Sequence, residues 1–306
     1  MSLPKQPITI REVGTRDGIQ SLGAFIDTDQ KIELIEALAD TGLRRIEATS
    51  FVNPKAVPQM ADAADVMSRV RRRPDVSYEA LVPNMRGARD ALAAQVDGVL
   101  VVLTASEAFN QKNVRMSVED SLEQFAAIKS LVDQAGVACI GAIGTAFGCP
   151  YEGDIPESRL FALIDRLRAM GFSETMLADT TGMANPVQIE RTVSRVLQRW
   201  GDDMVFGLHL HNTRGMGLAN VVAGLRAGIT TFDASIAGIG GCPFAPQAAG
   251  NISTEDTVHM LHEMGLETGI DLERLIDVAR LGQRVLGREL PGQVMKAGPR
   301  WQLHAA

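Results

Sequence analysis

The chain has 306 residues, of which 45% are hydrophobic, so it could form two average domains or one large α/β barrel. No apolar run approaches the length that crosses a bilayer, and the N-terminal residues lack the charged and apolar regions of a signal peptide. A formal net charge of −7 without a large basic cluster excludes nucleic acid as an expected partner, and three scattered cysteines fit a reducing compartment. We therefore expect a soluble cytoplasmic protein with no membrane partner.

Short apolar runs alternate with segments of helical period along the whole chain. In order, the predicted strands cover residues 8–13, 45–49, 77–82, 98–103, 137–143, 174–179, 205–211 and 231–236. The predicted helices cover residues 28–40, 58–71, 85–94, 118–134, 157–170, 186–200 and 216–227, and a helical part covers about 254–290. The run 98–103, Gly-Val-Leu-Val-Val-Leu, is typical of a strand that is buried on both faces of a parallel sheet.

Eight strands that are each followed by a helix indicate an α/β protein with a (β/α)8 TIM-barrel fold. The alternative is a doubly wound open sheet, but its glycine-rich cofactor turn is missing after the first strand, where residues 14–18 read Gly-Thr-Arg-Asp-Gly. No linker or break in composition separates the units. We expect a single TIM-barrel domain over residues 1–306, with a helical C-terminal extension over about residues 254–306.

Polar residues of unusual kinds follow the predicted strands at their C-terminal ends, where TIM barrels carry their active sites. They are Arg16, Asp17, Glu47, Asp179, His209, His211 and Cys242. Each of these residues is ordinary alone. Their common end of the barrel predicts that they converge on one site.

His209 and His211 are two of only five histidines and lie two residues apart on a predicted strand. Residues i and i+2 of a strand point to the same side, so both imidazoles face the barrel mouth. Satisfied core histidines are the commoner explanation of an isolated pair, but Asp17 at the same rim favours a shared metal ion. With an amide oxygen from Asn251, the mixed nitrogen and oxygen donors suit Mg²⁺ or Mn²⁺ better than zinc.

The charged residues at the rim could have structural roles or roles in a reaction. Arg16 and Asp17 could form a plain surface ion pair, but we expect Asp17 to bind metal and Arg16 to stabilise an enolate or hold a carboxylate. Glu47 is expected to orient Arg16 through a charge-assisted hydrogen bond. Asp179 either belongs to the site or caps the next helix, and the sequence leaves both alternatives open.

Residues 237–243, Ala-Gly-Ile-Gly-Gly-Cys-Pro, place three glycines before Cys242. This segment could be a flexible loop with an inert thiol. It could also be a mobile loop that brings Cys242 over the barrel mouth as an acid, base or nucleophile, and composition favours neither. Cys149 is expected to be structural, and Cys139 is expected to be buried in the fifth strand.

In combination these residues resemble the 3-hydroxy-3-methylglutaryl-CoA (HMG-CoA) lyase family, within a wider group of metal-dependent barrels that includes isopropylmalate and citramalate synthases. The resemblance covers about residues 11–284. Its most specific element is Ser-Ile-Ala-Gly-Ile-Gly-Gly-Cys-Pro-Phe over residues 235–244. The other matching stretches are Thr-Arg-Asp-Gly-Ile-Gln (15–20), Glu-Ala-Thr-Ser-Phe-Val (47–52), Gly-Cys-Pro-Tyr-Glu-Gly (148–153) and Ala-Gly-Asn (249–251).

The resemblance implies roles for the residues at the rim. It implies a divalent metal, Mg²⁺ or Mn²⁺, with the ligands Asp17, His209, His211 and Asn251. Arg16 matches an arginine that binds substrate and stabilises the enolate, and Cys242 matches a catalytic cysteine. Glu47 and Asp179 match acidic residues that support the site.

The resemblance also implies an acyl-CoA substrate, cleaved between C2 and C3, and a place in leucine degradation and ketone-body metabolism. His209 or Cys242 would return a proton to the enolate carbon. Lys112 and Asn113 would lie in a loop over residues 109–115, near the path of coenzyme A. A homodimer is expected from the resemblance alone.

Several positions depart from the family pattern. The chain has Ser-Leu-Gly at residues 21–23, Gly-Thr-Ala-Phe at 144–147, and Asn212 and Arg214 after the second histidine. These changes surround the predicted metal ligands, so they put the acyl group in question. HMG-CoA is the expected substrate, and a citramalyl-CoA or a longer 3-hydroxy-3-alkylglutaryl-CoA are alternatives. A condensing synthase would lack the Gly-Gly-Cys-Pro loop, and a non-catalytic paralogue that binds metal and CoA is the alternative from a different class.

Overall fold

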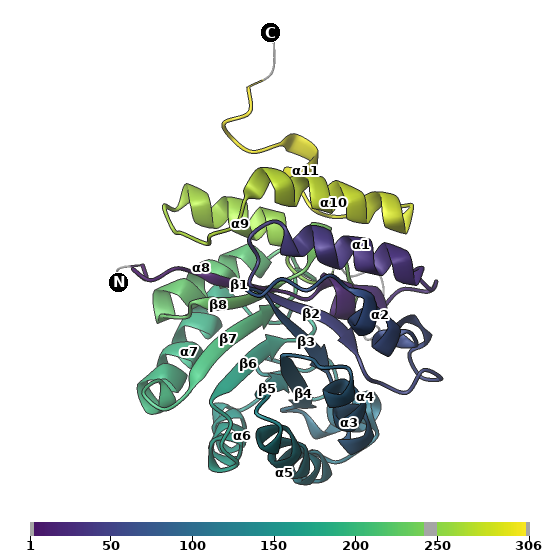
Figure 1. The fold of residues 1–306 in the computed structure, drawn as a ribbon. Helices are drawn as coiled ribbons and strands as arrows, with labels where there is room; N and C mark the ends of the chain where they lie inside the picture. Colours follow the sequence, from purple (N-terminus) through teal and green to yellow (C-terminus); the bar gives the residue numbers. More distant parts are fainter. Residues whose placement is uncertain (1–2, 242–249, 304–306) are drawn as a thin grey trace.

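A computed structural model describes residues 3–241 and 250–303, and within these ranges the strands form one closed barrel (Figure 1). Neighbouring strands follow the chain order and are parallel, and β1 pairs with β8 to close the barrel. The strands are β1 (Thr9–Glu12), β2 (Arg45–Ser50), β3 (Ser77–Leu81), β4 (Gly98–Thr104), β5 (Ala138–Gly144), β6 (Glu174–Asp179), β7 (Val205–Leu210) and β8 (Thr231–Ala234). The predicted TIM barrel is confirmed.

Helices surround the barrel and cover its outer face (Figure 1). Those between strands are α1 (Thr28–Ala39), α2 (Ala63–Arg69), α3 (Met85–Ala93), α4 (Glu107–Val114), α5 (Val118–Gln134), α6 (Glu157–Ala169), α7 (Pro186–Trp200) and α8 (Gly217–Ala227). The C-terminal helices are α9 (Thr254–Glu263), α10 (Leu272–Leu286) and α11 (Val294–Ala297). Short helical turns are η1 (Gly14–Gly18), η2 (Pro58–Met60) and η3 (Ile236–Gly238).

Two segments differ from the sequence prediction. The helix predicted over residues 58–71 is broken into the turn η2 and the helix α2, which begins only at Ala63. Residues 109–115, expected as a loop, lie mostly in α4. The Ser106 hydroxyl caps this helix by accepting a hydrogen bond from the Phe109 N–H at 3.1 Å. Serine followed by an acidic residue is a normal signal for a helix start, so the error lay in overlooking it.

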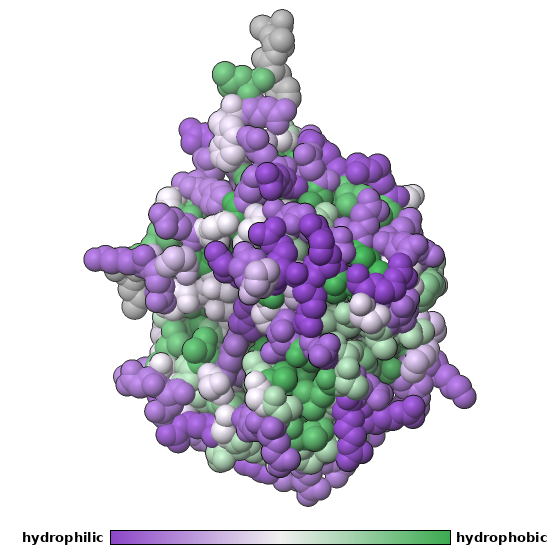
Figure 2. Space-filling view, in the orientation of Figure 1, coloured by the Kyte–Doolittle hydropathy of each residue, from purple (hydrophilic) through white to green (hydrophobic). Residues whose placement is uncertain are grey.

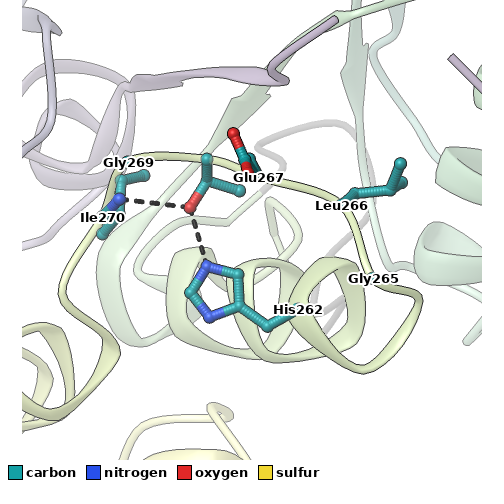
Figure 3. Close-up of a pocket in the computed structure, with 7 residues that line it drawn as sticks. His262, Gly265, Leu266, Glu267, Gly269 and Ile270 are labelled. Carbon is teal, nitrogen blue, oxygen red and sulfur yellow. Dashed lines mark hydrogen bonds between the residues drawn. The ribbon is translucent and has the colours of Figure 1, made fainter. Parts of the chain in front are cut away.

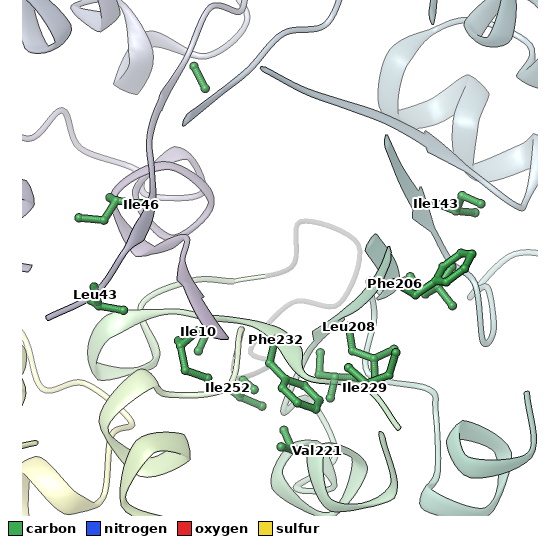
Figure 4. Close-up of a cluster of buried hydrophobic side chains, with 14 of the residues drawn as sticks. Ile10, Leu43, Ile46, Ile143, Phe206, Leu208, Val221, Ile229, Phe232 and Ile252 are labelled. Carbon is green, nitrogen blue, oxygen red and sulfur yellow. The ribbon is translucent and has the colours of Figure 1, made fainter. Parts of the chain in front are cut away.

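Alternation along the strands separates an apolar outer face from a polar interior. Ile10, Ile46, Leu208 and Phe232 belong to the buried cluster that packs under the helices, and Figure 4 shows Phe232 and Leu208 beside Val221 of α8. The residues that directly follow these four along the chain point the other way, into the barrel. They are Arg11, Glu47, His209 and Asp233.

The barrel interior is divided between charged and apolar residues. A separate apolar cluster is contributed by β3 to β6, and its members are Leu81, Leu100, Val102, Ile140, Ala142 and Met176. Most of the charged residues come instead from β1, β2, β7 and β8, with Glu79 from β3 and Asp179 from β6. The strands therefore place most of the ionisable groups on one side of the barrel and an apolar wall on the other.

The outer surface shows the complementary pattern. Figure 2 shows hydrophilic residues over the C-terminal helices, and hydrophobic residues reach the surface mainly in the lower half of the view, where Figure 1 places β4 and β5. None of the helices that the structure describes is both long enough and apolar enough to cross a membrane.

A surface pocket lies at the connection between α9 and α10 (Figure 3). Its His262 Nε2 lies 2.9 Å from the Thr268 hydroxyl, which also accepts a hydrogen bond from the Ile270 N–H at 3.2 Å. The Glu267 carbonyl of the same segment accepts from the Ile8 N–H, directly before β1. The pocket therefore lies at the amino end of the strands, opposite the end where the predicted site residues gather.

Candidate active site

Arg16 and Asp17 reach the barrel mouth because the chain turns tightly after β1. In the turn η1 the N–H groups of Arg16, Asp17 and Gly18 all point to the Val13 carbonyl, at 2.7 to 3.3 Å. Such a one-turn π-helix reverses the chain directly above the strand. It places the two charged side chains next to each other, and the Arg16 Nη1 donates to Asp17 Oδ1 at 2.7 Å.

The predicted metal ligands lie together at this mouth. The Nε2 atoms of His209 and His211 are 3.0 Å apart, and one ligand atom from each of Asp17, His209 and His211 falls within 4.8 Å of the others. Asn251 Nδ2 donates to Asp17 Oδ2 at 2.8 Å. A flip of this amide would present its oxygen to the same space.

Asn251 comes close because its segment pairs with the end of β7. His211 and Asn251 form an antiparallel bridge, and the Asn212 N–H donates to the Gly250 carbonyl at 2.9 Å. A Cβ on Gly250 would lie 2.6 Å from the carbonyl carbon of Gly240, so only glycine permits this approach of the two segments. This close packing explains the glycine before Asn251.

The contact expected between Glu47 and Arg16 is present. Arg16 donates from Nε to Glu47 Oε1 at 2.7 Å and from Nη2 to Glu47 Oε2 at 2.8 Å. Both side chains are buried, and the paired geometry fixes the guanidinium plane. Three of the five N–H groups of Arg16 are thus engaged by Glu47 and Asp17, which leaves two for a substrate.

The electrostatics of the cluster favour a bound cation. Burial would raise the pKa of Asp17, but Arg16 and the two imidazoles outweigh it and hold the pKa well below its usual range. Burial, with a contribution from His209, lowers the pKa of His211 to about 3, so its imidazole is neutral. His211 Nδ1 is buried without a hydrogen-bond partner among the described residues. Burial lowers the pKa of His209, but the hydrogen bond to Asp233 and the charges of Asp233 and Asp17 outweigh it and raise the pKa. The acidic surroundings of His209, the anionic Asp17 and the neutral His211 imidazole fit a divalent metal ion.

Asp233 and Arg11 belong to the site although the sequence analysis missed them. Asp233 Oδ2 lies 3.0 Å from His209 Nδ1, which places the ring proton on Nδ1 and leaves the Nε2 lone pair facing His211. Arg11 forms ion pairs with Asp233, at 3.1 Å, and with Glu47, at 3.3 Å. The available signal was alternation, because both charged residues follow an outward-facing apolar residue on their strand.

Asp179 holds the loop that follows β6. Its Oδ1 accepts hydrogen bonds from the N–H groups of Met183 at 2.8 Å and Ala184 at 3.1 Å. Its Oδ2 is buried and has no hydrogen-bond partner in the part of the chain that the structure describes. Burial raises the pKa of Asp179 to about 6, against the effect of the two N–H groups. The next helix, α7, is capped by Asn185, whose side chain accepts from the Gln188 N–H at 3.0 Å, so the capping alternative was wrong, and a role of Asp179 in the site stays a prediction.

The remaining candidates lie apart from the metal ligands or outside the described residues. Lys112, on α4, holds its Nζ 4.6 Å from the centre of the Tyr151 ring, and Asn113 is the next residue of the same helix. Cys242 lies outside the described residues. The other two thiols are buried, as expected, and Cys149 Sγ lies 3.0 Å from the Ser106 hydroxyl.

Arg214 is exposed in the loop after β7 and donates from Nη1 to the carbonyls of Thr181 and Gly182, at 3.0 and 2.8 Å. It therefore ties this loop to the one after β6. Any effect of Arg214 on the acyl group stays a prediction.

Comparison with known proteins identifies the family of this fold and site. The family model described as HMGL-like matches residues 7–281. The chain belongs to the HMGL-like family.

Relatives of this HMGL-like chain match it over nearly their whole length. A hydroxymethylglutaryl-CoA lyase of Bacillus subtilis is 42% identical over 293 residues, which cover 96% of this chain and 97% of the relative. A cytoplasmic 3-hydroxy-3-methylglutaryl-CoA lyase of Danio rerio is 41% identical over 297 residues, which cover 96% of this chain and 88% of the relative. Among solved structures, an HMG-CoA lyase of Acinetobacter baumannii in complex with coenzyme A and 3-methylmalate has a TM-score of 0.94 at 43% identity, with both chains covered completely.

Next to the turn η3, this HMGL-like chain carries a buried carboxyl that the sequence analysis also missed, that of Glu255. Glu255 Oε2 accepts a hydrogen bond from the Ala237 N–H at 2.9 Å, and Ala237 has a positive φ of 54°. Glu255 Oε1 is buried without a hydrogen-bond partner within residues 3–241 and 250–303. Burial, assisted by Asp256, raises the pKa of Glu255 to about 8, so the carboxyl is protonated near neutral pH.

We expect Glu255→Gln to remove a pH dependence from the stability of the fold. The carboxyl contributes most below its ordinary pKa of about 4.5, and this contribution is lost as pH rises through about 8, at up to about 1.4 kcal/mol per pH unit. Urea unfolding at pH 5 and pH 8 should therefore show a smaller fall in the free energy of unfolding for Glu255→Gln than for the wild type. The exposed Glu33→Gln is the control for loss of a carboxylate. Parallel pH profiles for Glu255→Gln and the wild type would contradict the assignment.

Proposed function

We propose that this protein is a divalent-metal-dependent lyase that cleaves HMG-CoA to acetyl-CoA and acetoacetate. The observation that carries the proposal is the cluster of Asp17, His209 and His211, with Asn251 and Arg16 hydrogen-bonded to the same carboxylate. The names of relatives that are about 40% identical over nearly the whole chain support the substrate. The proposed compartment is the cytoplasm, which the sparse cysteines support, and the proposed assembly is a homodimer, which the family resemblance supports.

Mg²⁺ or Mn²⁺ is the proposed metal, held by Asp17, His209, His211 and Asn251. When bound, such an ion would hold the C3 hydroxyl and a carboxyl oxygen of the substrate and lower the pKa of that hydroxyl. Two imidazole nitrogens with carboxylate and amide oxygens form a donor set that these ions accept. The hydrogen bond from His209 Nδ1 to Asp233 keeps the other ring nitrogen available for this role.

The reaction requires one proton to leave the C3 hydroxyl and one to reach C2. Loss of the hydroxyl proton drives the C2–C3 electron pair onto C2, so that acetoacetate leaves and the enolate of acetyl-CoA remains. Arg16 can donate its two unengaged N–H groups to the enolate oxygen, and Glu47 keeps the guanidinium in place. Cys242 then gives a proton to C2, because both ring nitrogens of His209 are engaged by the metal and Asp233 in this proposal.

The coenzyme A moiety is proposed to pass along α4. This helix begins after β4 and therefore lies at the same end of the barrel as the metal ligands. Lys112 on α4 offers a positive charge for a phosphate, and its Nζ is held over the Tyr151 ring. The coenzyme A bound to the Acinetobacter relative supports an acyl-CoA ligand.

The test is acetyl-CoA and acetoacetate release from HMG-CoA with added Mg²⁺ or Mn²⁺. We expect activity that EDTA removes, and a loss of about 10² to 10⁴ in kcat for Cys242→Ala if the thiol transfers the proton. Cys139→Ala, which removes a buried thiol of β5, is the control and should keep the activity. Equal turnover with and without metal, or unchanged turnover in Cys242→Ala, would contradict the corresponding part of the proposal.

Two other outcomes would change the proposed function. Bound metal without cleavage of HMG-CoA, but with cleavage of a citramalyl-CoA or a longer 3-hydroxy-3-alkylglutaryl-CoA, would change the substrate and keep the chemistry. Bound metal without turnover of any hydroxyacyl-CoA would support a non-catalytic paralogue.

A further inference from the structure

A network of buried charges fills one side of the barrel below the metal ligands, and Arg11 lies at its branch point. The Arg11 side chain is fully buried and projects from β1 into the barrel. Its Nε donates to Glu79 Oε2 at 2.5 Å, and its Nη1 donates to Asp233 Oδ2 at 3.1 Å. Its Nη2 forms an ion pair with Glu47 Oε2 at 3.3 Å and makes no hydrogen bond within the described residues. One guanidinium thus contacts carboxylates from β2, β3 and β8.

Two of these three carboxylates hold the groups proposed for the reaction. Asp233 contacts the His209 ring at Nδ1, and Glu47 binds Arg16 through two hydrogen bonds. His209 belongs to the proposed metal ligands, and Arg16 is the proposed enolate-stabilising residue. Arg11 is therefore connected to His209 through one carboxylate and to Arg16 through another.

The geometry of the guanidinium matters here as well as its charge. A guanidinium is planar and carries its donors in a rigid fork, so it can fix two carboxylates relative to one another across a strand. A lysine at this position would supply a single point charge and could not hold Glu79 and Asp233 in set directions. Loss of the arginine would also leave buried carboxylates without a partner, which strongly destabilises the fold.

We propose that Arg11 is a positioning residue for the lyase reaction, which holds the metal arm through Asp233 and the enolate arm through Glu47. The inference rests on the proposed function, because it names a residue that supports the same site. Arg11 itself contacts neither a proposed metal ligand nor Arg16 in the part of the chain that the structure describes. Its effect must pass through the two carboxylates.

A matched control is available in the same network. Arg45, on β2, is also largely buried and donates to Glu79 Oε1 at 2.7 Å and to Glu174 Oε1 at 2.6 Å. Neither of these carboxylates makes a hydrogen bond to Arg16 or His209 among the described residues. Arg45→Met therefore removes an arginine of the same network, one contact further from the site.

The experiment measures Mn²⁺ affinity by calorimetry or electron paramagnetic resonance, together with kcat, KM and thermal unfolding. For Arg11→Met we expect Mn²⁺ affinity and kcat to fall by about 10-fold to 100-fold, which is the usual effect of losing an outer-shell partner. For Arg45→Met we expect lower thermal stability with Mn²⁺ affinity unchanged. Arg11→Lys keeps the charge and provides the readout if Arg11→Met does not fold; it should bind Mn²⁺ more weakly than the wild type.

The outcomes separate this inference from the proposed function. Equal Mn²⁺ affinities in the wild type, Arg11→Met and Arg11→Lys would overturn the inference, and so would an equal loss in Arg11→Met and Arg45→Met. In both cases the wild-type activity would still support a lyase. A wild-type protein that binds no Mn²⁺ and cleaves no hydroxyacyl-CoA would instead overturn the proposed function.

Discussion

Asp17→Asn is expected to lower metal-dependent cleavage of HMG-CoA by about a thousandfold or more. Asp17 is the only anionic member of the proposed ligand set, and it accepts hydrogen bonds from Arg16, Gln20 and Asn251. Asparagine keeps the shape but removes the charge that a divalent ion requires. A loss of about 4 kcal/mol in the stabilisation of the transition state corresponds to this factor.

The measurement is initial rate over a wide range of Mn²⁺ concentration, with Mn²⁺ binding measured on the same samples. Asp202→Asn, an exposed change of the same kind, is the control and should leave both quantities unchanged. If Asp17→Asn bound Mn²⁺ as tightly as the wild type, Asp17 would be excluded as a ligand. Thermal unfolding near the wild-type temperature would show that the loss is local to the site.

The barrel was predictable because its signals are local. Apolar runs and helical periods recur in order along the chain, and a strand such as β4, apolar at nearly every position, requires cover on both faces. The location of Asp17 and His209 at the same end of the barrel was also predictable from chain order, because parallel strands have their C-terminal ends together.

The supporting contacts were not predictable in this way, because they depend on which side chains meet across the barrel. Arg11 and Asp233 are 222 positions apart in the sequence and meet only because β1 pairs with β8 in a defined register. Asn251 reaches Asp17 through an irregular bridge to the end of β7, which no period describes. For Asp179, the sequence could not show that Asn185 caps the next helix and that Asp179 instead accepts from the N–H groups of the loop before it.

Arg16→Gln is expected to lower kcat by about 10² to 10³ while leaving Mn²⁺ affinity intact. Removal of the guanidinium takes away the two N–H groups that are free to meet the enolate oxygen, and the loss of one such preorganised donor has an effect of this size. Because Arg16 also donates to Asp17 Oδ1, its removal frees an oxygen of a proposed metal ligand and should not weaken the metal site.

The contrast with Asp17→Asn makes the two roles separable in one set of measurements. Arg16→Lys retains a positive charge but cannot bind Glu47 through two parallel hydrogen bonds, so it should recover only part of kcat. If kcat and Mn²⁺ affinity fell together in Arg16→Gln, Arg16 would act by ordering Asp17 rather than by stabilising the enolate. A fall in kcat alone would assign it to the reacting oxygen.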